Sequence, residues 1–299
     1  MKIALTPKRT RRLALTEGII AGTLFGTASI FIRLLKQLDT FSIAFWRLVV
    51  ASAILTLILA IIRKNLKFSS ITRNLLKDLT ILGIFLGLHF IFFVSAVKDT
   101  TILNATVLVN TTPIFSMLIS SFLFKIKPSR LALFGLIISF SGACIIAYAE
   151  ASPGGFSPNI KGDLEAVLAA IVEAFYLNFG RKTRGQMPLL SIMLPIYIMA
   201  ALIVGVISIP TGHTLAVPLE VEILVLLICI GFLPTAMAHT LYFSSLSNLK
   251  SFETATMALL EPIGATILGI LTFQEVPQAI FVLGAFLILF GILFVAKEK

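Results

Sequence analysis

Two stretches of the sequence decide the fold: VLVNTTPIFSMLISSFLF at residues 107–124, and TMALLEPIGATILGILTF at residues 256–273. They lie 149 residues apart, and the dipeptide Pro-Ile has the same position in each, at Pro113 and Pro262. Each stretch is mostly apolar and close to the roughly 20 residues that a helix needs to cross a bilayer. A proline inside a helix removes a backbone hydrogen bond and kinks the helix. We therefore predict two equivalent membrane helices, each kinked near its centre.

The same shift of 149 residues aligns the two halves of the chain outside these stretches. Five further identical pairs fall in register without a gap: Ser95 and Ser244, Phe124 and Phe273, Pro128 and Pro277, Gly135 and Gly284, Gly142 and Gly291. The apolar runs predict five helices in each half. Because five is odd, the second half is expected to enter the membrane inverted relative to the first. We place the first repeat at residues 14–149 and the second at residues 162–296.

The composition agrees with a chain that is solvated by lipid. The 299 residues are 58% hydrophobic and 13% charged, with a mean hydropathy of +1.04, whereas soluble domains are about 45–50% apolar. Ten helices would use about 200 residues. We therefore predict an all-α integral membrane protein with ten transmembrane helices as two inverted five-helix repeats. The helices are expected near residues 17–36, 41–62, 77–97, 101–124, 130–149, 163–180, 188–209, 222–246, 251–273 and 277–295.

The basic residues predict the orientation of the chain. With the N-terminus inside, 19 of the 24 Lys and Arg residues fall in inside segments and 4 in outside segments. Cytoplasmic loops carry such an excess, so both termini are expected in the cytoplasm of a multi-pass protein of the cell's inner membrane. The net charge of +10 follows from these loops, which argues against a nucleic-acid partner.

The order of several short motifs carries a family resemblance. They are AFWR at 44–47, TPIF at 112–115 and the glycines at 135 and 142 in the first half, then LEPI at 260–263, FQE at 273–275 and the glycines at 284 and 291. Each half resembles an EamA domain, and the whole chain resembles the ten-helix branch of the drug/metabolite transporter superfamily. The resemblance implies a secondary transporter, not an enzyme, that exports or exchanges small metabolites, most familiarly amino acids, by alternating access. It implies a small-molecule substrate within the lipid bilayer, with protons as a possible coupling ion.

Two other classes compete with this interpretation: a flippase for lipid-linked sugars, and an integral-membrane enzyme acting on lipid. The sequence contains no Walker motif, which argues against ATP-driven transport by this chain. It also contains no HExxH motif or acidic metal cluster, so we expect neither a cofactor nor a metal site.

Two carboxylates, Glu173 and Glu261, fall closest to the predicted centre of the membrane. A charge at that depth costs roughly 2.5–3.5 kcal/mol on insertion scales, so such a residue usually faces the bundle interior. We expect both to bind substrate or a proton, the alternative being a structural pair with a residue such as Arg47. His89 and His239 lie on corresponding helices and titrate near neutral pH, so they are candidates to relay protons, or else hydrogen-bond between helices.

Arg47 and Trp46 are interpreted as structural or gating residues of the second helix. The guanidinium is expected to form an ion pair or a gating contact, with direct binding of a substrate carboxylate as the alternative, and Trp46 fits an interfacial belt. Pro113 and Pro262 are expected to line the cavity, because groups freed by a kink must face protein or water. The remaining candidates for substrate contact are polar or aromatic residues near these positions: Asn110, Thr112, Tyr176, Asn178 and Tyr242.

Overall fold

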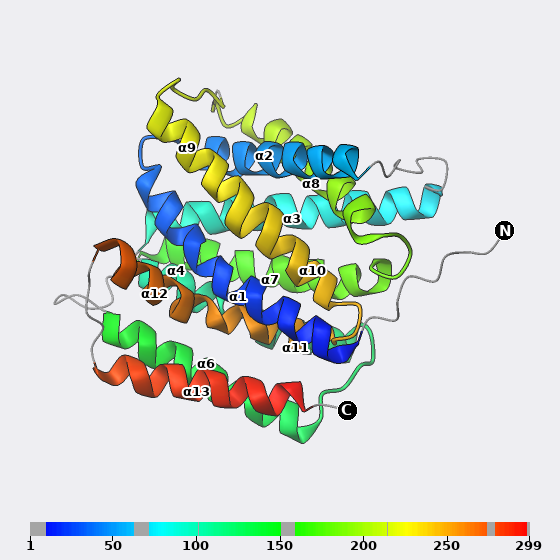
Figure 1. Ribbon diagram of the computed structural model, residues 1–299, viewed down its shortest axis with the longest axis vertical. Helices are drawn as coiled ribbons and strands as arrows, with labels where there is room; N and C mark the ends of the chain where they lie inside the picture. Colours follow the sequence, from blue (N-terminus) through cyan, green and yellow to red (C-terminus); the bar gives the residue numbers. More distant parts are fainter. Residues whose placement is uncertain are drawn as a thin grey trace.

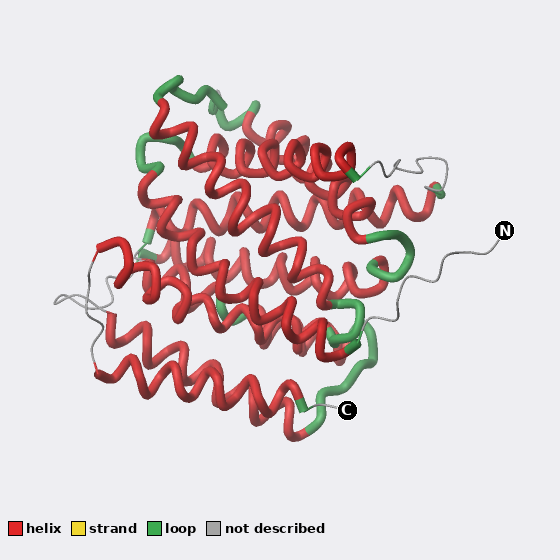
Figure 2. The backbone as a smooth tube through the Cα atoms, viewed as in Figure 1, coloured by secondary structure: helices red, strands yellow, loops and turns green. Residues whose placement is uncertain are grey.

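The computed structural model describes residues 10–62, 72–100, 102–150, 159–213, 215–273 and 279–297. Within these ranges the chain forms helices and no strand (Figure 1). The helices run side by side across the molecule, with the described loops at its two ends (Figure 2). The start of α1 lies beside the end of α13, because Arg11 Nε donates to Ala296 O over 3.4 Å. The two described ends of the chain therefore share one side of the bundle.

Helix is present in each of the ten ranges that the apolar runs predict, and three of these ranges are divided into shorter segments. In chain order the segments are α1 (Arg11–Leu34), α2 (Thr40–Ile61), α3 (Arg73–Asp99), α4 (Ile102–Val109), α5 (Thr112–Phe122), α6 (Arg130–Glu150), α7 (Ile160–Thr183), α8 (Leu189–Ser208), α9 (Val221–Ile230), the π-helical η2 (Gly231–His239), α10 (Thr240–Ser245), α11 (Ser251–Met257), the single 3₁₀ turn η3 (Ala258–Leu260), α12 (Glu261–Phe273) and α13 (Ala279–Ala296).

Several helices begin earlier than the apolar runs predict, because a polar residue caps them. α1 begins at Arg11 rather than near residue 17, and Thr10 Oγ1 accepts a hydrogen bond of 3.2 Å from the Leu13 amide. α3 likewise begins at Arg73, capped by Thr72. Such caps satisfy amides that have no partner within the helix. Hydropathy therefore locates the part of a helix that crosses lipid and misses its polar first turn.

Seven helices of the described chain are long and apolar enough to cross a membrane. They are Arg11–Leu34, Thr40–Ile61, Arg73–Asp99, Asn104–Phe122, Leu189–Ser208, Val221–Ser245 and Ala279–Ala296. Two of these spans join shorter segments, because Asn104–Phe122 runs from α4 into α5 and Val221–Ser245 comprises α9, η2 and α10. The outward face of the last one is apolar as well, since Phe286 is 60% exposed and Leu293 is 58% exposed. Large exposed apolar surfaces of this kind suit contact with lipid.

The predicted breaks are present at both Pro113 and Pro262. α4 ends at Val109 and α5 begins at Thr112, with Pro113 in its first turn. In the second half the 3₁₀ turn η3 separates α11 from α12, which begins at Glu261 and has Pro262 as its second residue. A third irregular segment was not predicted. The π-helical η2 contains Pro234, which has no amide to donate.

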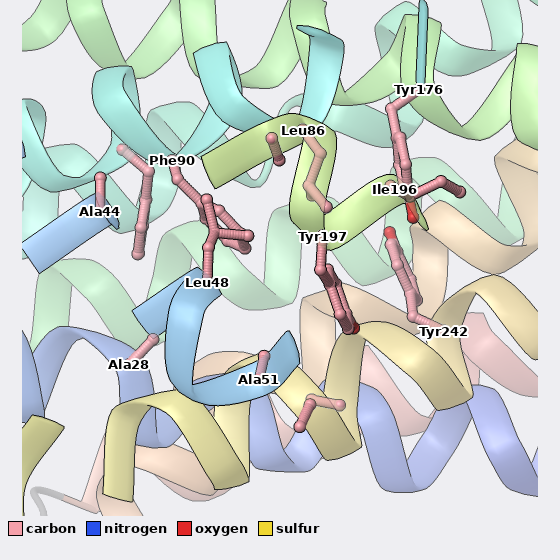
Figure 3. Packing of buried hydrophobic residues seen from close by; sticks show 14 of the residues in the cluster. Ala28, Ala44, Leu48, Ala51, Leu86, Phe90, Tyr176, Ile196, Tyr197 and Tyr242 are labelled. Atoms are coloured by element: carbon pink, nitrogen blue, oxygen red, sulfur yellow. The ribbon is translucent and has the colours of Figure 1, made fainter. Parts of the chain in front are cut away.

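Packing between the halves follows a paired pattern. α1 packs on α12 and α10, while the corresponding helix of the second half, α7, packs on α5 and α3. α6 packs on its counterpart α13, and the two lie together at one edge of the molecule (Figure 1). A buried apolar core fills the space between the other helices, where the side chains of Phe90, Tyr197 and Tyr242 are less than 2% exposed (Figure 3).

The α6–α13 contact depends on glycines at its crossing points. A Cβ atom added to Gly142 would lie 2.6 Å from Gly284 O and 2.8 Å from Ile288 N. We expect Gly142→Ala to force the helices apart and to destabilise the protein by about 1–3 kcal/mol. Thermal unfolding in detergent should show a midpoint lowered by several degrees. Gly185→Ala is the control, because no atom lies within 4 Å of a Cβ at Gly185. Equal midpoints for the two variants would contradict this account of the contact.

Candidate functional site

A buried cavity lies where the two halves meet, beside the helix breaks at Pro113 and Pro262. Its volume is about 30 Å³, which is room for about two water molecules. It is lined by Phe25, Ala28, Arg47, His89, Phe90, Phe93, Val109, Asn110, Thr112, Glu173, His239, Ala258 and Glu261. Seven of the predicted site residues are thus brought together, from six separate regions of the chain. The surrounding helices are apolar, so this is a concentration of ionisable groups inside a low-dielectric bundle.

Glu173 lies on α7, and its carboxylate faces α3 and the start of α5. Glu173 Oε2 lies 3.2 Å from the Thr112 hydroxyl, which can donate to it, and 3.8 Å from His89 Nδ1. The Glu173 side chain is 6% exposed, as is that of His89. His89 Nδ1 also lies 3.1 Å from Ala169 O, which is therefore its hydrogen-bond partner, because the Glu173 carboxylate lies beyond hydrogen-bond distance. The Glu173 carboxylate, the Thr112 hydroxyl and the His89 imidazole thus form one buried polar cluster.

Glu261 occupies the first position of α12, directly after the 3₁₀ turn. Its carboxylate Oε2 accepts a 3.4 Å hydrogen bond from Asn110 Nδ2, which stands in the gap between α4 and α5. The two helix breaks therefore meet through one hydrogen bond.

Arg47 is fully buried, with 1% of its surface exposed. Its Nε donates to Thr235 Oγ1 over 2.9 Å, and its Cζ lies 4.0 Å from the centre of the Phe90 ring. Among the described residues, Nη1 has no hydrogen-bond partner and no carboxylate lies within ion-pair distance of the guanidinium. The expected ion pair with a carboxylate is therefore absent from the described chain. The π-helical turn and Phe90 hold the guanidinium instead.

The two histidines lie against each other and against aromatic rings. The ring centres of His89 and His239 are 5.9 Å apart, and His239 also packs on Phe25 at 4.7 Å and on Phe90 at 4.9 Å. Within the described chain His239 Nδ1 has no hydrogen-bond partner. No group of three or more His, Cys, Asp and Glu residues in the described ranges is placed to hold a metal ion.

Three residues predicted to contact substrate lie outside the cavity lining. Asn178 joins α7 to α5 and α11, because its amide nitrogen donates to Ser116 O over 3.2 Å and its oxygen accepts from Ser251 Oγ over 2.7 Å. Tyr176 packs with its hydroxyl 3.9 Å from Met193 Sδ. Tyr242 packs edge-on against Phe25, and Figure 3 shows the Tyr176 and Tyr242 rings pointing toward one another.

Trp46 and the prolines are also beside the cavity rather than in its wall. Trp46 Nε1 donates to Leu215 O over 2.9 Å, which fastens α2 to the segment before α9. Pro113 and Pro262 break their helices, and their neighbours Thr112 and Glu261 line the cavity in their place. The breaks and the inward position of Thr112 and Glu261 were thus predicted from the sequence, whereas the prediction that the two prolines line the cavity was wrong.

Three aromatic residues of the cavity wall, Phe25, Phe90 and Phe93, were not predicted, nor was the contact of Thr235 with Arg47. The chain contains 25 Phe residues, so no single one stands out. A signal for Thr235 was present, because Gly231 and Pro234 interrupt an apolar run.

Polar contacts close the bundle at its two opposite ends. At one end Arg11 donates from Nη2 to Glu253 Oε1 over 2.6 Å and from Nη1 to Oε2 over 3.2 Å. At the other end Lys161 Nζ lies 2.7 Å from Asp99 Oδ2, and Thr100 donates to Asp163 over 2.9 Å. We call these the Arg11 clamp and the Lys161 clamp. The Glu253 side chain is completely buried, whereas that of Lys161 is 71% exposed.

Comparison with known proteins gives one family and one fold. Residues 13–148 and 160–297 each match the EamA-like transporter family. A protein of Archaeoglobus fulgidus, called an uncharacterized transporter, is 27% identical over 281 residues, which are 94% of each chain. An uncharacterized transporter of Bacillus subtilis is 24% identical over 66% of this chain and 61% of its own. A protein of known crystal structure superimposes with a TM-score of 0.79 over 96% of this chain and 98% of its own, at 17% identity, and so has the same fold.

Proposed function

This chain belongs to the EamA-like transporter family, and from that premise we propose that it is a secondary carrier that exports or exchanges small metabolites such as amino acids. It is a transporter and not an enzyme, as its relatives are. We propose that its ten helices cross the cytoplasmic membrane as two inverted repeats that move by alternating access. The observation that carries this proposal is the cavity, because it joins ionisable groups of both halves at two helix breaks.

Broken helices favour a binding role for the cavity. In membrane carriers, substrate sites lie near the midplane between repeats, where discontinuous helices expose backbone and polar groups. Here both breaks meet at Asn110 and Glu261. A space of about 30 Å³ holds water but no metabolite, so a substrate requires the halves to separate.

The two clamps supply a means to separate the halves from one end at a time. The Arg11 clamp holds α1 to α11, and the Lys161 clamp holds α3 to α7. Because the two clamps join different helix pairs at opposite ends, opening one of them exposes the cavity to one side only. This arrangement supports rocking of one repeat against the other. In the intermediate state of that motion both clamps are formed, and in each of the two open states one clamp is broken.

We propose that Glu173 carries the coupling proton. The carboxylate is buried, has a hydroxyl donor in Thr112, and lies beside a histidine. A buried carboxylate that alternates between contact with protein and contact with water can load a proton on one side and release it on the other.

Counterflow in proteoliposomes tests the carrier proposal. Vesicles preloaded with an unlabelled amino acid should accumulate the labelled one transiently, and the rate should saturate. Linear flux would instead indicate a pore. Scrambling of lipid-linked sugars would indicate a flippase, and formation of a new lipid product would indicate an enzyme.

The orientation is tested by cysteine labelling at exposed loop positions. Cysteines at Gln37 and Thr211 should react with an impermeant thiol reagent added to intact cells, while those at Gln186 and Ser247 should react only after permeabilisation. All four positions are exposed to solvent. The prediction follows from the excess of basic residues in the inside segments taken together, which hold 19 of the 24 Lys and Arg residues.

The labelling requires a background without the native thiols Cys144 and Cys229, which are both partly buried. Alanine at both positions supplies it, and the background itself should stay unlabelled. The opposite labelling pattern would show that the termini face the outside.

A further inference from the structure

The guanidinium of Arg47 is a buried cation without an anion in the described chain. Its side chain is 1% exposed, so the charge does not reach the membrane surface. Nη1 has no hydrogen-bond partner among the described residues, although a buried donor left unpaired costs about 1–3 kcal/mol. Arg47 belongs to the cavity wall. A fold that retains such a group leaves its charge and donors for something that enters the cavity.

The position of the guanidinium is fixed by contacts that leave one edge free. Thr235 Oγ1 accepts from Nε and donates in turn to Ile230 O, and the Phe90 ring lies against the guanidinium. A Cβ on Gly231 would lie 2.5 Å from Val50 Cβ, so the glycine allows the π-helical turn to approach α2. A planar fork held in this way is prepared for a carboxylate, which it can bind through two oxygens.

The other charged groups of the cavity are engaged elsewhere. Glu261 accepts from Asn110, and Glu173 lies beside Thr112 and His89. Neither carboxylate lies within ion-pair distance of the Arg47 guanidinium among the described residues. One incoming carboxylate therefore matches the single positive charge of Arg47, whereas a dianionic phosphate adds an uncompensated charge.

We propose that Arg47 is a specificity-determining residue that binds the carboxylate of the transported molecule. This inference rests on the proposed function, since it takes the cavity as the transport site. It replaces the structural ion pair that the sequence suggested. The carrier therefore distinguishes acids from amines of the same carbon skeleton.

The test compares three probes with one branched carbon skeleton. L-leucine carries both charged groups, 4-methylpentanoate carries only the carboxylate, and 3-methylbutylamine carries only the ammonium. The chain has a single tryptophan, Trp46, which is next to Arg47 and provides a fluorescence signal. None of the probes absorbs where tryptophan is excited. Binding is measured on the full-length protein in nanodiscs, with thermal stabilisation as a second readout.

We expect both carboxylates to bind at least about tenfold more tightly than the amine. Arg47→Gln should weaken the binding of both carboxylates roughly 10- to 100-fold and leave the binding of 3-methylbutylamine unchanged. The affinity of Arg47→Lys for both carboxylates should lie between those of the wild-type protein and Arg47→Gln, because lysine keeps the charge but lacks the planar guanidinium that binds two oxygens. Arg181→Gln is the control, since Arg181 hydrogen-bonds to Leu249 O and lies outside the cavity wall.

Three results would overturn the inference: an amine that binds the wild-type protein as tightly as the acids, no binding of either acid at millimolar concentration, or equal losses for all probes in Arg47→Gln. The first two need no variant, so a variant that fails to fold does not remove the test. Counterflow separates the two proposals. Saturable counterflow with no preference for acids would support the carrier proposal and reject the role of Arg47. Tight Arg47-dependent binding without counterflow would support the role of Arg47 and reject the carrier proposal.

Discussion

Glu173→Gln should abolish net transport driven by a pH gradient while leaving substrate exchange close to the wild-type rate. Glutamine keeps the size of the side chain and an oxygen that can accept from the Thr112 hydroxyl, now 3.2 Å from the carboxylate. It cannot bind and release a proton. Net transport requires that the proton leave the carrier on each cycle. In exchange, the carrier returns across the membrane with substrate bound, so the proton need not leave. We expect a loss of at least about tenfold in pH-driven flux and an unchanged amount of protein in the membrane.

Flux and counterflow in proteoliposomes, with and without a pH gradient, measure both activities. Glu222→Gln is the control, because Glu222 is an exposed carboxylate in the first turn of α9. If both activities fall together with a higher half-saturation concentration, Glu173 binds a cationic group of the substrate instead of a coupling proton. Wild-type behaviour in both assays would reduce Glu173 to a structural residue.

Glu253→Gln should open the cavity at the end that the Arg11 clamp closes. The carboxylate accepts two hydrogen bonds from Arg11 and one of 2.5 Å from the Lys250 amide. Removing its charge weakens a bidentate ion pair whose carboxylate is completely buried. Hydrogen bonds to charged groups contribute about 1.5–3 kcal/mol, so the open arrangement should gain roughly 10- to 100-fold in population.

A cysteine at Ala258, which lines the cavity and is 7% exposed, reports this opening. Its reaction rate with a small thiol reagent should rise at least about tenfold in Glu253→Gln, and the rise should come from the side that the Arg11 clamp faces. Transport should fall, because a carrier held open on one side seldom completes its cycle.

The matched variant at the opposite end is Lys161→Gln. It removes the contact with Asp99 at 2.7 Å and should expose the Ala258 cysteine from the other side. The effect should be smaller, because Lys161 is largely exposed and surface ion pairs contribute little. Equal labelling of Ala258 cysteine from both sides in each variant would show that the clamps do not gate the cavity.

The helices of this fold were predictable because each membrane helix must form its own backbone hydrogen bonds. Backbone groups in lipid need partners within the same segment, and an apolar run of sufficient length therefore marks a helix whatever surrounds it. Repetition at 149 residues and the two prolines located the breaks around Asn110 and Glu261. The family followed from the same motifs, and two EamA-like matches confirm it. The inverted insertion and the cytoplasmic termini stay predictions.

The composition of the site was predictable only in part. Glu173, Glu261, His89 and His239 stand out because charged or titratable groups inside apolar helices are costly, so their presence predicted an inward position, and the cavity contains all four. Asn178 shows the limit of this reasoning. A polar side chain in a membrane helix can be satisfied by hydrogen bonds between helices as well as by a ligand, and Asn178 is satisfied by Ser116 and Ser251.

The sequence by itself therefore determined that the chain lies in lipid, where its helices and helix breaks are, that it contains a repeat, and which family it belongs to. These properties depend on short segments and on their spacing. Only the tertiary structure decided which side chains meet. In the structure Arg47 contacts the Phe90 ring and donates a hydrogen bond to Thr235 rather than pairing with a carboxylate. The buried carboxylate of Glu253 pairs with Arg11. Such contacts depend on the rotation and crossing of helices far apart in the chain. Close packing sets these, and the apolarity of a segment says nothing about which of its faces a neighbouring helix will cover.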